Sequence, residues 1–207
     1  MTKKKHSPFY LNLFLMLTFA LNSTNVSSQL IDIQSLDTIP ELTYVQALKQ
    51  DPLNVYKLTF RKQKLTELPD ITQFKNLQSL NISRNKLSSL PKQIFEFQYL
   101  QNLDVSDNPI STIPVEIGNL VYLRKFIANE TNITGLPAEI SKLKVLNYLD
   151  VWGTNVASFP DEIADLKETL KEIDMRVIMM NNSEHQKIKT LLPQTKIHFS
   201  KSCNCGF

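Results

Sequence analysis

The chain has few of the residues on which enzyme chemistry depends. Its 207 residues include four glycines, three histidines, two cysteines and one tryptophan. The glycines lie too far apart to form a loop that holds a phosphate group. No motif pairs a histidine with a nucleophile or a metal, and no paired-carboxylate motif is present. The composition therefore argues against an enzyme, and we expect no cofactor and no metal site.

The excess of positive charge is confined to one short segment. The formal net charge is +3, and Lys3, Lys4 and Lys5 lie in a stretch of 28 residues without an acid. Without that stretch the chain has 20 basic and 20 acidic side chains. A protein that binds a phosphate backbone needs a basic excess of its own. The sequence therefore predicts no nucleic-acid partner.

Residues 1–28 have the pattern of a secretory signal peptide. Basic residues precede an apolar run from Phe9 to Leu21, and small polar residues then lead to Ser28 and Gln29. The apolar run would rise only about 20 Å as a helix, less than the ~30 Å of a bilayer core. We expect cleavage near Ser28–Gln29, a periplasmic, cell-surface or secreted location, and no stable membrane span afterwards. An uncleaved anchor is the alternative.

A repeat dominates the rest of the chain. Prolines follow a large apolar residue at positions 69, 91, 114, 137 and 160, at intervals of 22, 23, 23 and 23 residues. Before these pairs lie segments such as Leu77–Leu87 and Leu100–Ile110, with apolar residues at positions 1, 4, 6 and 11. Side chains alternate between the two faces of a strand, so positions 3, 5 and 7 point outward. Because one such strand cannot bury its apolar face alone, stacked copies are expected to form a parallel sheet over a continuous core.

This pattern resembles the leucine-rich-repeat family, whose L-x-x-L-x-L-x-x-N-x-L core is followed here by a Leu-Pro pair. The resemblance covers residues 55–180, in about six copies. The 23-residue spacing is similar to that of secreted bacterial members, and the flanks resemble those of Bacteroidetes proteins. The resemblance implies an α/β solenoid, a horseshoe or arc with a parallel sheet on its concave face and helical caps. We expect the N-terminal cap in residues 29–54 and a C-terminal cap with a cysteine-containing tail in residues 181–207.

Both ends of the solenoid contain capping signals. A short helix is predicted from Leu42 to Leu48, as part of the N-terminal cap. A second helix is predicted over Ser183–Leu192, because Ser183 and Gln186 have the spacing of a capping box. Lys196–Phe199 is predicted to form a closing strand. We expect both caps to be polar outside, which favours a monomer.

The ninth position of each copy is predicted to be structural. The amides of Asn85 and Asn108 can reach backbone groups in the turn after the strand, and those groups need partners. Thr131 and Thr154 take this position in later copies and have less reach. These four residues are therefore expected to hold turns and to form no site.

Positions 3, 5, 7 and 8 are predicted to form the concave face, which is the usual binding surface of a solenoid. The first two strands are basic there, and acidic side chains prevail from the third strand onward. Tyrosine and tryptophan, which are enriched at binding hot spots, accompany the acids in the later half. The candidate partner-binding residues are Lys57, Arg61, Lys62, Arg84, Asp104, Asp107, Ile127, Tyr148, Asp150, Trp152, Glu172, Asp174 and Arg176.

These residues predict a non-catalytic protein–protein interaction module, secreted or on the cell surface. We expect the side chains from Tyr148 onward to hold a cationic segment of a partner protein, and the basic end to meet an acidic one. The alternative is that all of these face side chains are solvated and bind no partner. An intracellular scaffold for a small GTPase or phosphatase is a second reading, although the hydrophobic leader argues against it. Adhesion to envelope glycans is a third, because a concave tryptophan beside acids would also suit a sugar.

Cys203 and Cys205, the two cysteines, both lie in the tail. In a secreted protein they could form a strained disulfide with each other, pair with another chain to give a dimer, or stay as thiols. A zinc site is a poor fit, because zinc needs four ligands. The residues alone leave these states open.

The leader and the tail together generate a prediction about intact mass. Protein released by its host and kept without reductant should have the mass of a chain that begins near Gln29. A further loss of about two hydrogens would assign a Cys203–Cys205 bridge, and a doubled mass a disulfide dimer. A full-length mass found only in the cytosol would contradict export and would favour the scaffold reading.

Overall fold

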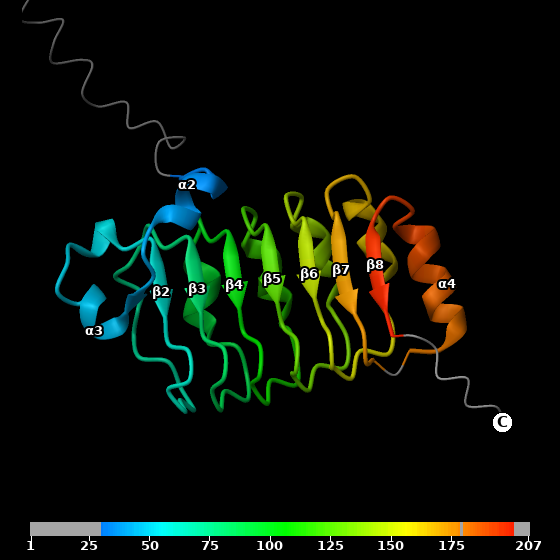
Figure 1. Ribbon diagram of the computed structural model, residues 1–207, viewed down its shortest axis with the longest axis horizontal. Helices are drawn as coiled ribbons and strands as arrows, with labels where there is room; N and C mark the ends of the chain where they lie inside the picture. The colour runs from blue at the N-terminus through cyan, green and yellow to red at the C-terminus, as the bar shows by residue number, and fades with distance from the viewer. Residues whose placement is uncertain (1–29, 179, 201–207) are drawn as a thin grey trace, which may run out of the picture. The chain divides into compact units, whose positions relative to one another are not determined.

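The strands of successive repeats stack into one parallel sheet (Figure 1). The computed structural model describes residues 30–178 and 180–200, so the predictions for residues 1–28 and for Cys203 and Cys205 lie outside the described residues. From Asp32 onward the described residues form one compact unit. Its sheet follows chain order through eight strands: β1 (Leu42–Thr43), β2 (Lys57–Thr59), β3 (Ser79–Asn81), β4 (Asn102–Asp104), β5 (Lys125–Ile127), β6 (Tyr148–Asp150), β7 (Glu172–Met175) and β8 (Lys196–Phe199).

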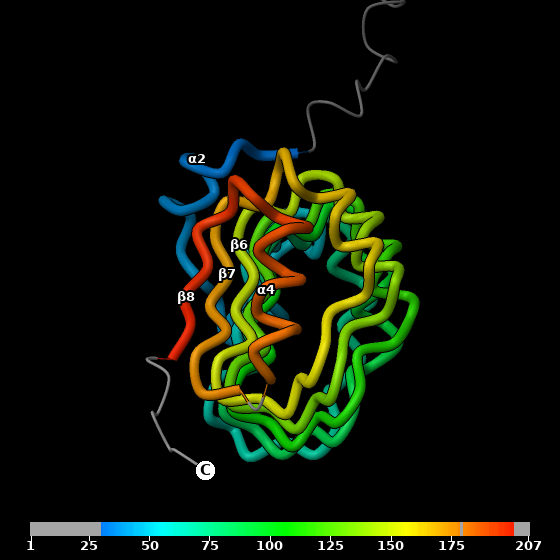
Figure 2. Tube along the Cα trace, turned by 90° about the vertical axis from the view of Figure 1, so that its right-hand side faces the viewer, coloured from blue at the N-terminus to red at the C-terminus, as the bar shows by residue number. Residues whose placement is uncertain are grey.

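Short 3-10 helices lie in the segments that return the chain from one strand to the next. Figure 2 looks along the stack and shows the strands on one side and the returning segments on the other. Four of these helices begin directly after a proline of a repeat, because proline fixes φ near −65° and has no N–H for the first turn to leave unpaired. The helices are η3 (Pro52–Asn54), η4 (Lys92–Glu96), η5 (Val115–Asn119), η6 (Ala138–Lys142) and η7 (Asp161–Leu166).

The register predicted from the repeat is confirmed. Fourth positions of successive copies pair directly, as in Leu80 with Leu103 and Leu149 with Ile173. Positions 1, 4, 6 and 11 are buried in every copy except at Leu65, which is partly buried. These side chains form one continuous core that runs the length of the stack. The leucine-rich-repeat horseshoe with an outward sheet face is therefore the observed architecture.

The ninth-position prediction is also confirmed. The Asn85 amide donates to the carbonyls of Phe60, Ile82 and Ser83, and its oxygen accepts from the N–H groups of Gln63 and Leu65. Asn108 repeats this pattern one copy later. The shorter side chains of Thr131 and Thr154 each donate one hydrogen bond to a carbonyl of their own copy, so they join neighbouring copies less firmly.

The N-terminal cap differs from the prediction. It contains α2 (Ile33–Thr38), which was not expected, and α3 (Tyr44–Ala47), which is shorter than predicted. Thr43 and Gln46 form the capping box of α3, so the helix cannot begin at Leu42. Leu42 and Thr43 instead extend the sheet as β1 and pair with β2. The first edge of the sheet is thus one strand further out than the repeats predict.

The outer surface of the N-terminal cap is polar only in part. The side chains of Val45, Leu48 and Leu53 are 64%, 52% and 53% exposed. The expectation that both caps are polar outside is therefore wrong at this end. None of the helices in the described part of the chain is long and apolar enough to cross a membrane.

The C-terminal cap confirms the helix and the closing strand but not the capping residue. Helix α4 (Asn182–Leu191) covers the end of the core, and β8 follows it. Asn181 caps the helix, since its Oδ1 accepts from the Glu184 N–H at 2.9 Å and from the Ser183 hydroxyl at 2.6 Å. The predicted Ser183–Gln186 capping box is wrong, because Asn181 takes the capping position and Ser183 becomes its hydrogen-bond donor.

The asparagine ladder gives a stability prediction. Asn85→Ala removes five hydrogen bonds and leaves buried backbone groups without partners, so we expect the free energy of unfolding to fall by about 3 kcal/mol or more. Thr131→Val removes one hydrogen bond to the Ala128 carbonyl and should cost about 1 kcal/mol. Urea denaturation of both variants measures the difference. Equal losses would mean that the asparagine has no larger role than the threonine.

Candidate partner-binding face

The outward face of the sheet, which we call the concave face, is made of columns of side chains. Register pairs place each third and fifth position beside the equivalent position of the next copy, about 4.8 Å away. The third-position column is Lys57, Ser79, Asn102, Lys125, Tyr148, Glu172 and Lys196. The fifth-position column is Thr59, Asn81, Asp104, Ile127, Asp150, Asp174 and His198.

Most fifth-position side chains hold the turn that follows their strand. Each accepts a hydrogen bond from the backbone N–H two residues later, as Asn81 does from Ser83 and Asp104 from Ser106, both at 3.0 Å. Thr59, Asp150 and Asp174 make the same contact. The repeat pattern alone predicted that these side chains would face the solvent without a contact inside the chain. The Asn-x-Ser and Asp-x-Ser spacings are the signal that could have revealed the turns.

The eighth position completes each turn in the left-handed region of φ. Its residues are Lys62, Arg84, Asp107, Glu130, Gly153 and Val177, with φ between 52° and 65°. Most are not glycine, so the turn must be held by its other contacts. The fifth-position hydrogen bonds supply part of that hold. The backbone that presents the seventh and eighth side chains is therefore fixed by the sequence of the strand itself.

Among the six repeat copies, Ile127 is the exception in the fifth-position column. Its side chain cannot accept a hydrogen bond, so the turn of its copy lacks the contact that five other copies make. The Asn129 side chain instead reaches across to the next copy and donates to Asp150 Oδ2 at 2.6 Å. Ile127 is thus a partly exposed apolar side chain in a column whose other members are polar. Its copy lacks the turn hydrogen bond as a result.

Ile127 belongs to a group that the sequence analysis predicted to lie together. We call Ile127, Tyr148 and Trp152 the aromatic cluster. Ile127 pairs in register with Asp150, and Tyr148 and Trp152 lie two residues before and after that aspartate on the same face. All three side chains of the cluster are half-exposed. The Lys125 ammonium lies 5.1 Å from the centre of the Tyr148 ring, which is a cation–π contact within the chain.

Asp150, in the middle of the aromatic cluster, is almost buried. Its residue is 8% exposed. Burial raises the pKa of this carboxyl above its ordinary value, and the neighbouring Asp174 raises it further. Hydrogen bonds from the Asn129 amide and the Trp152 N–H oppose that shift. The site thus holds a carboxylate in a poorly solvated position.

The two acids of β7, Asp174 and Glu172, are both paired within the chain. Arg176 donates to Asp174 with both Nε and Nη2, the latter at 2.6 Å. Although burial opposes it, this pairing keeps the pKa of Asp174 below its ordinary value. Glu172 lies 2.6 Å from His198 Nε2 and 3.4 Å from Lys196 Nζ, and the His198 contact lowers its pKa. The repeat pattern placed Arg176 on this half of the face, but it did not place Lys196 or His198 there.

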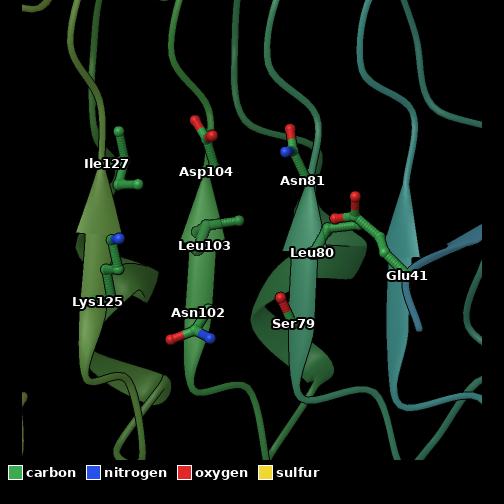
Figure 3. Close-up of a pocket in the computed structure, with 9 residues that line it drawn as sticks. All are labelled: Glu41, Ser79, Leu80, Asn81, Asn102, Leu103, Asp104, Lys125 and Ile127. Atoms are coloured by element: carbon green, nitrogen blue, oxygen red, sulfur yellow. The ribbon is translucent and has the colours of Figure 1, made fainter. Parts of the chain in front are cut away.

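The basic half of the concave face also carries an acidic side chain, Glu41. Figure 3 shows the Glu41 side chain reaching across β2 toward β3, beside a shallow pocket of about 170 Å³ that extends to Asn81, Asp104 and Ile127. Partial burial raises the pKa of Glu41, while Lys57 and Arg61 act in the other direction. Sequence reasoning missed Glu41, because it precedes the first repeat and belongs to no column.

The remaining predicted basic residue, Arg84, forms an ion pair with Asp107 at 3.7 Å. Both side chains are about half exposed, and such surface pairs contribute about 0–1 kcal/mol. The pair is therefore easily given up to a partner. It also places opposite charges side by side at the boundary between the basic and acidic halves.

The two histidines in the described part of the chain have different surroundings. His198 lies on the concave face against Glu172, as the strand alternation predicts. His185 lies on α4, where its ring centre is 4.6 Å from that of the Phe199 ring, and burial lowers its pKa. Within residues 30–178 and 180–200, no group of three or more His, Cys, Asp or Glu side chains is arranged to hold a metal ion.

Comparison with known proteins agrees with this architecture. Residues 75–133 match the family model for the leucine rich repeat. A solved leucine-rich-repeat protein of Leptospira interrogans is 28% identical, with a TM-score of 0.68 over 77% of this chain and 41% of its own. The leucine-rich-repeat ectodomain of an Arabidopsis thaliana membrane receptor kinase, in complex with Casparian strip integrity factor 2, is 26% identical, with a TM-score of 0.59 over 72% of this chain and 18% of its own.

An internalin from Listeria monocytogenes shares the fold at 17% identity, with a TM-score of 0.53 over 73% of this chain and 51% of its own. No curated protein matches the sequence. Residues 75–133 are thus leucine-rich repeats, and the fold of the described chain is that of solved leucine-rich-repeat proteins. The chain spans less than half the length of the Leptospira and Arabidopsis structures. Its resemblance to secreted Bacteroidetes members stays a prediction.

The environment of Asp150 generates a prediction about pH. A carboxyl whose pKa is raised by folding binds protons more strongly in the folded state, so it lowers stability as pH rises through the raised pKa. Asp150→Asn removes this titration and keeps the turn contact, as Asn81 does in its own copy. We expect the variant to be at least as stable as the parent at pH 7, and to lose that advantage near pH 4, in urea denaturation.

Asp174→Asn is the matched control, because it changes the same atoms one strand away. The pKa of Asp174 is lowered, so its contribution to stability is present at neutral pH and lost as pH falls through that pKa. We expect this variant to be less stable at pH 7, by about 1 kcal/mol, since the Arg176 partner is half exposed. The same pH trend in both variants would contradict the assigned environments.

Proposed function

We propose that this leucine-rich-repeat chain is an exported, non-catalytic module that binds a partner protein on its concave face. The observation that carries the proposal is the aromatic cluster. Ile127 stands where five other copies have a polar residue that holds the turn, and its apolar side chain is half-exposed. Because Ile127 lies outside the core and its copy lacks the turn hydrogen bond, we assign the exposed part of this side chain to binding.

The cluster has the properties of a binding hot spot. Tyrosine and tryptophan can each bury about 150–250 Å² of surface, and their few rotatable bonds keep the entropy cost of binding low. Tyr148 lies on β6, which pairs in register with its neighbours on either side, and Trp152 lies in the turn that follows β6. The basic residues Lys57 and Arg61, three to four strands away, give the face a second polarity that can orient a partner.

Two further observations support a protein partner and export. The Arabidopsis ectodomain was solved in complex with Casparian strip integrity factor 2, and a plant peptide hormone receptor of the same fold was solved in complex with its ligand RGF2. The 1–28 segment of this chain has the pattern of a signal peptide. We therefore propose that the partner is an extracellular or envelope protein.

A photo-crosslinking pair tests the proposal. The photoreactive residue p-benzoylphenylalanine replaces Ile127 on the concave face in one protein and Val115 in the other. Val115 is the matched control, because it is also an exposed apolar residue, but it lies on η5 in a returning segment. We expect protein adducts in the native host from position 127, and none or fewer from position 115. Adducts that form only at position 115 would overturn the concave-face assignment.

Trp152→Ala tests the hot spot within the same experiment. Trp152 is half-exposed and belongs to no inward position, so the variant should fold, with a change in unfolding free energy below about 1 kcal/mol. Its protein adducts at position 127 should fall at least tenfold, since truncation of a hot spot costs about 2 kcal/mol or more. Glycan-array binding that Trp152→Ala abolishes, without any protein adduct, would support the envelope-glycan reading instead.

A further inference from the structure

Asp150 is a nearly buried carboxylate of the concave face that forms no ion pair. Glu172 contacts His198 and Lys196, and Asp174 is held by the Arg176 guanidinium. Asp150 accepts hydrogen bonds only from neutral donors, which are the Asn129 side-chain amide and the backbone N–H of Trp152. A nearly buried carboxylate without a cation is costly, because its lost hydration is not replaced.

The walls around Asp150 suit a flat cation. The Lys125 ammonium already lies over the Tyr148 ring. In the part of the chain that the structure describes, the Trp152 indole has no ring or cation contact, and its Nε1–H has no hydrogen-bond partner. Ile127 closes the side toward β5. The unpaired charge and the open aromatic face are therefore adjacent, on the same side of one strand.

The next strand contains the contact that Asp150 lacks. Asp174 occupies the same column, makes the same turn contact, and also receives a guanidinium through two of its nitrogens. A carboxylate has about four acceptor positions, and two of those on Asp150 are used. Arg176 does not fill the others: its Nε and Nη2 donate to Asp174, and its charge acts on Asp150 only without a hydrogen bond.

We propose that the partner of this face presents an arginine side chain to Asp150, with the guanidinium plane against the Trp152 indole. The inference rests on the proposed function and specifies the chemistry of the partner at that site. Arginine fits better than lysine, because the guanidinium is planar, more weakly hydrated, and able to stack on an aromatic ring while it donates to a carboxylate. The contact reproduces on Asp150 what Arg176 does on Asp174.

The single tryptophan of the chain makes the site directly observable. The probe is N-acetyl-arginine amide, titrated into the full chain while Trp152 fluorescence is recorded. N-acetyl-citrulline amide is the neutral control of nearly the same shape, and N-acetyl-lysine amide is the cationic control without a plane. We expect the fluorescence midpoint for the arginine amide to lie at least about tenfold below those for the citrulline and lysine amides, because only arginine supplies both charge and plane.

Asp150→Asn should abolish this preference and leave the weak response to citrulline unchanged. Asp104→Asn is the matched control, because Asp104 lies in the same column and makes the same turn contact but has no aromatic neighbour on its own strand. It should keep the tenfold preference. Urea denaturation of both variants checks that each is folded, and Asn81 provides the precedent for an amide at this position.

Three results would overturn the arginine site. They are equal midpoints for arginine and citrulline, equal midpoints for arginine and lysine, and a preference for arginine that persists in Asp150→Asn. None of them would affect the crosslinks from position 127. A failed arginine titration with intact concave-face adducts would therefore reject this inference alone. An arginine preference together with adducts only at position 115 would leave the Asp150 site standing and reject the proposed function.

Discussion

Parallel pairing between successive copies is the interaction on which the whole structure depends. The strands have only two to four residues, so no strand has a stable conformation of its own. Each gains its backbone partners and its core neighbours from the copies before and after it. The Asn85 and Asn108 amides extend this coupling into the turns. Every outward side chain is therefore carried by backbone whose contacts span copies, so the whole stack positions the concave face.

The same coupling explains how much the sequence could predict. A fixed period sets the register, and the register sets the columns, so the core and the proximity of Ile127, Tyr148 and Trp152 followed from spacing alone. The caps lie outside the period and depend on choices among similar side chains. Asn181 and Ser183 can both cap a helix, and only the three-dimensional path of the chain decided for Asn181.

Charge on the face was the least predictable property. Column positions show which side chains are neighbours, but not which long side chain folds back onto which acid. Arg176 reaches the aspartate two residues earlier, and Glu172 meets cations from β8, beyond the last repeat. Glu41 comes from a segment with no place in the repeat. A count of acids and bases along the face therefore overstated its net polarity, and Asp150 became distinct only when the pairings were known.

At the fifth position, the hydrogen bond that holds the turn does not depend on the charge of the side chain. An amide oxygen and a carboxylate oxygen accept the same backbone hydrogen bond there, as Asn81 and Asp104 do. A single-nucleotide exchange between asparagine and aspartate codons can thus add or remove one charge from the face while the scaffold is unchanged. The fifth position of a copy can therefore carry either a neutral or a negatively charged side chain. An exchange between the two changes the charge of the concave face and requires no compensating change in the core.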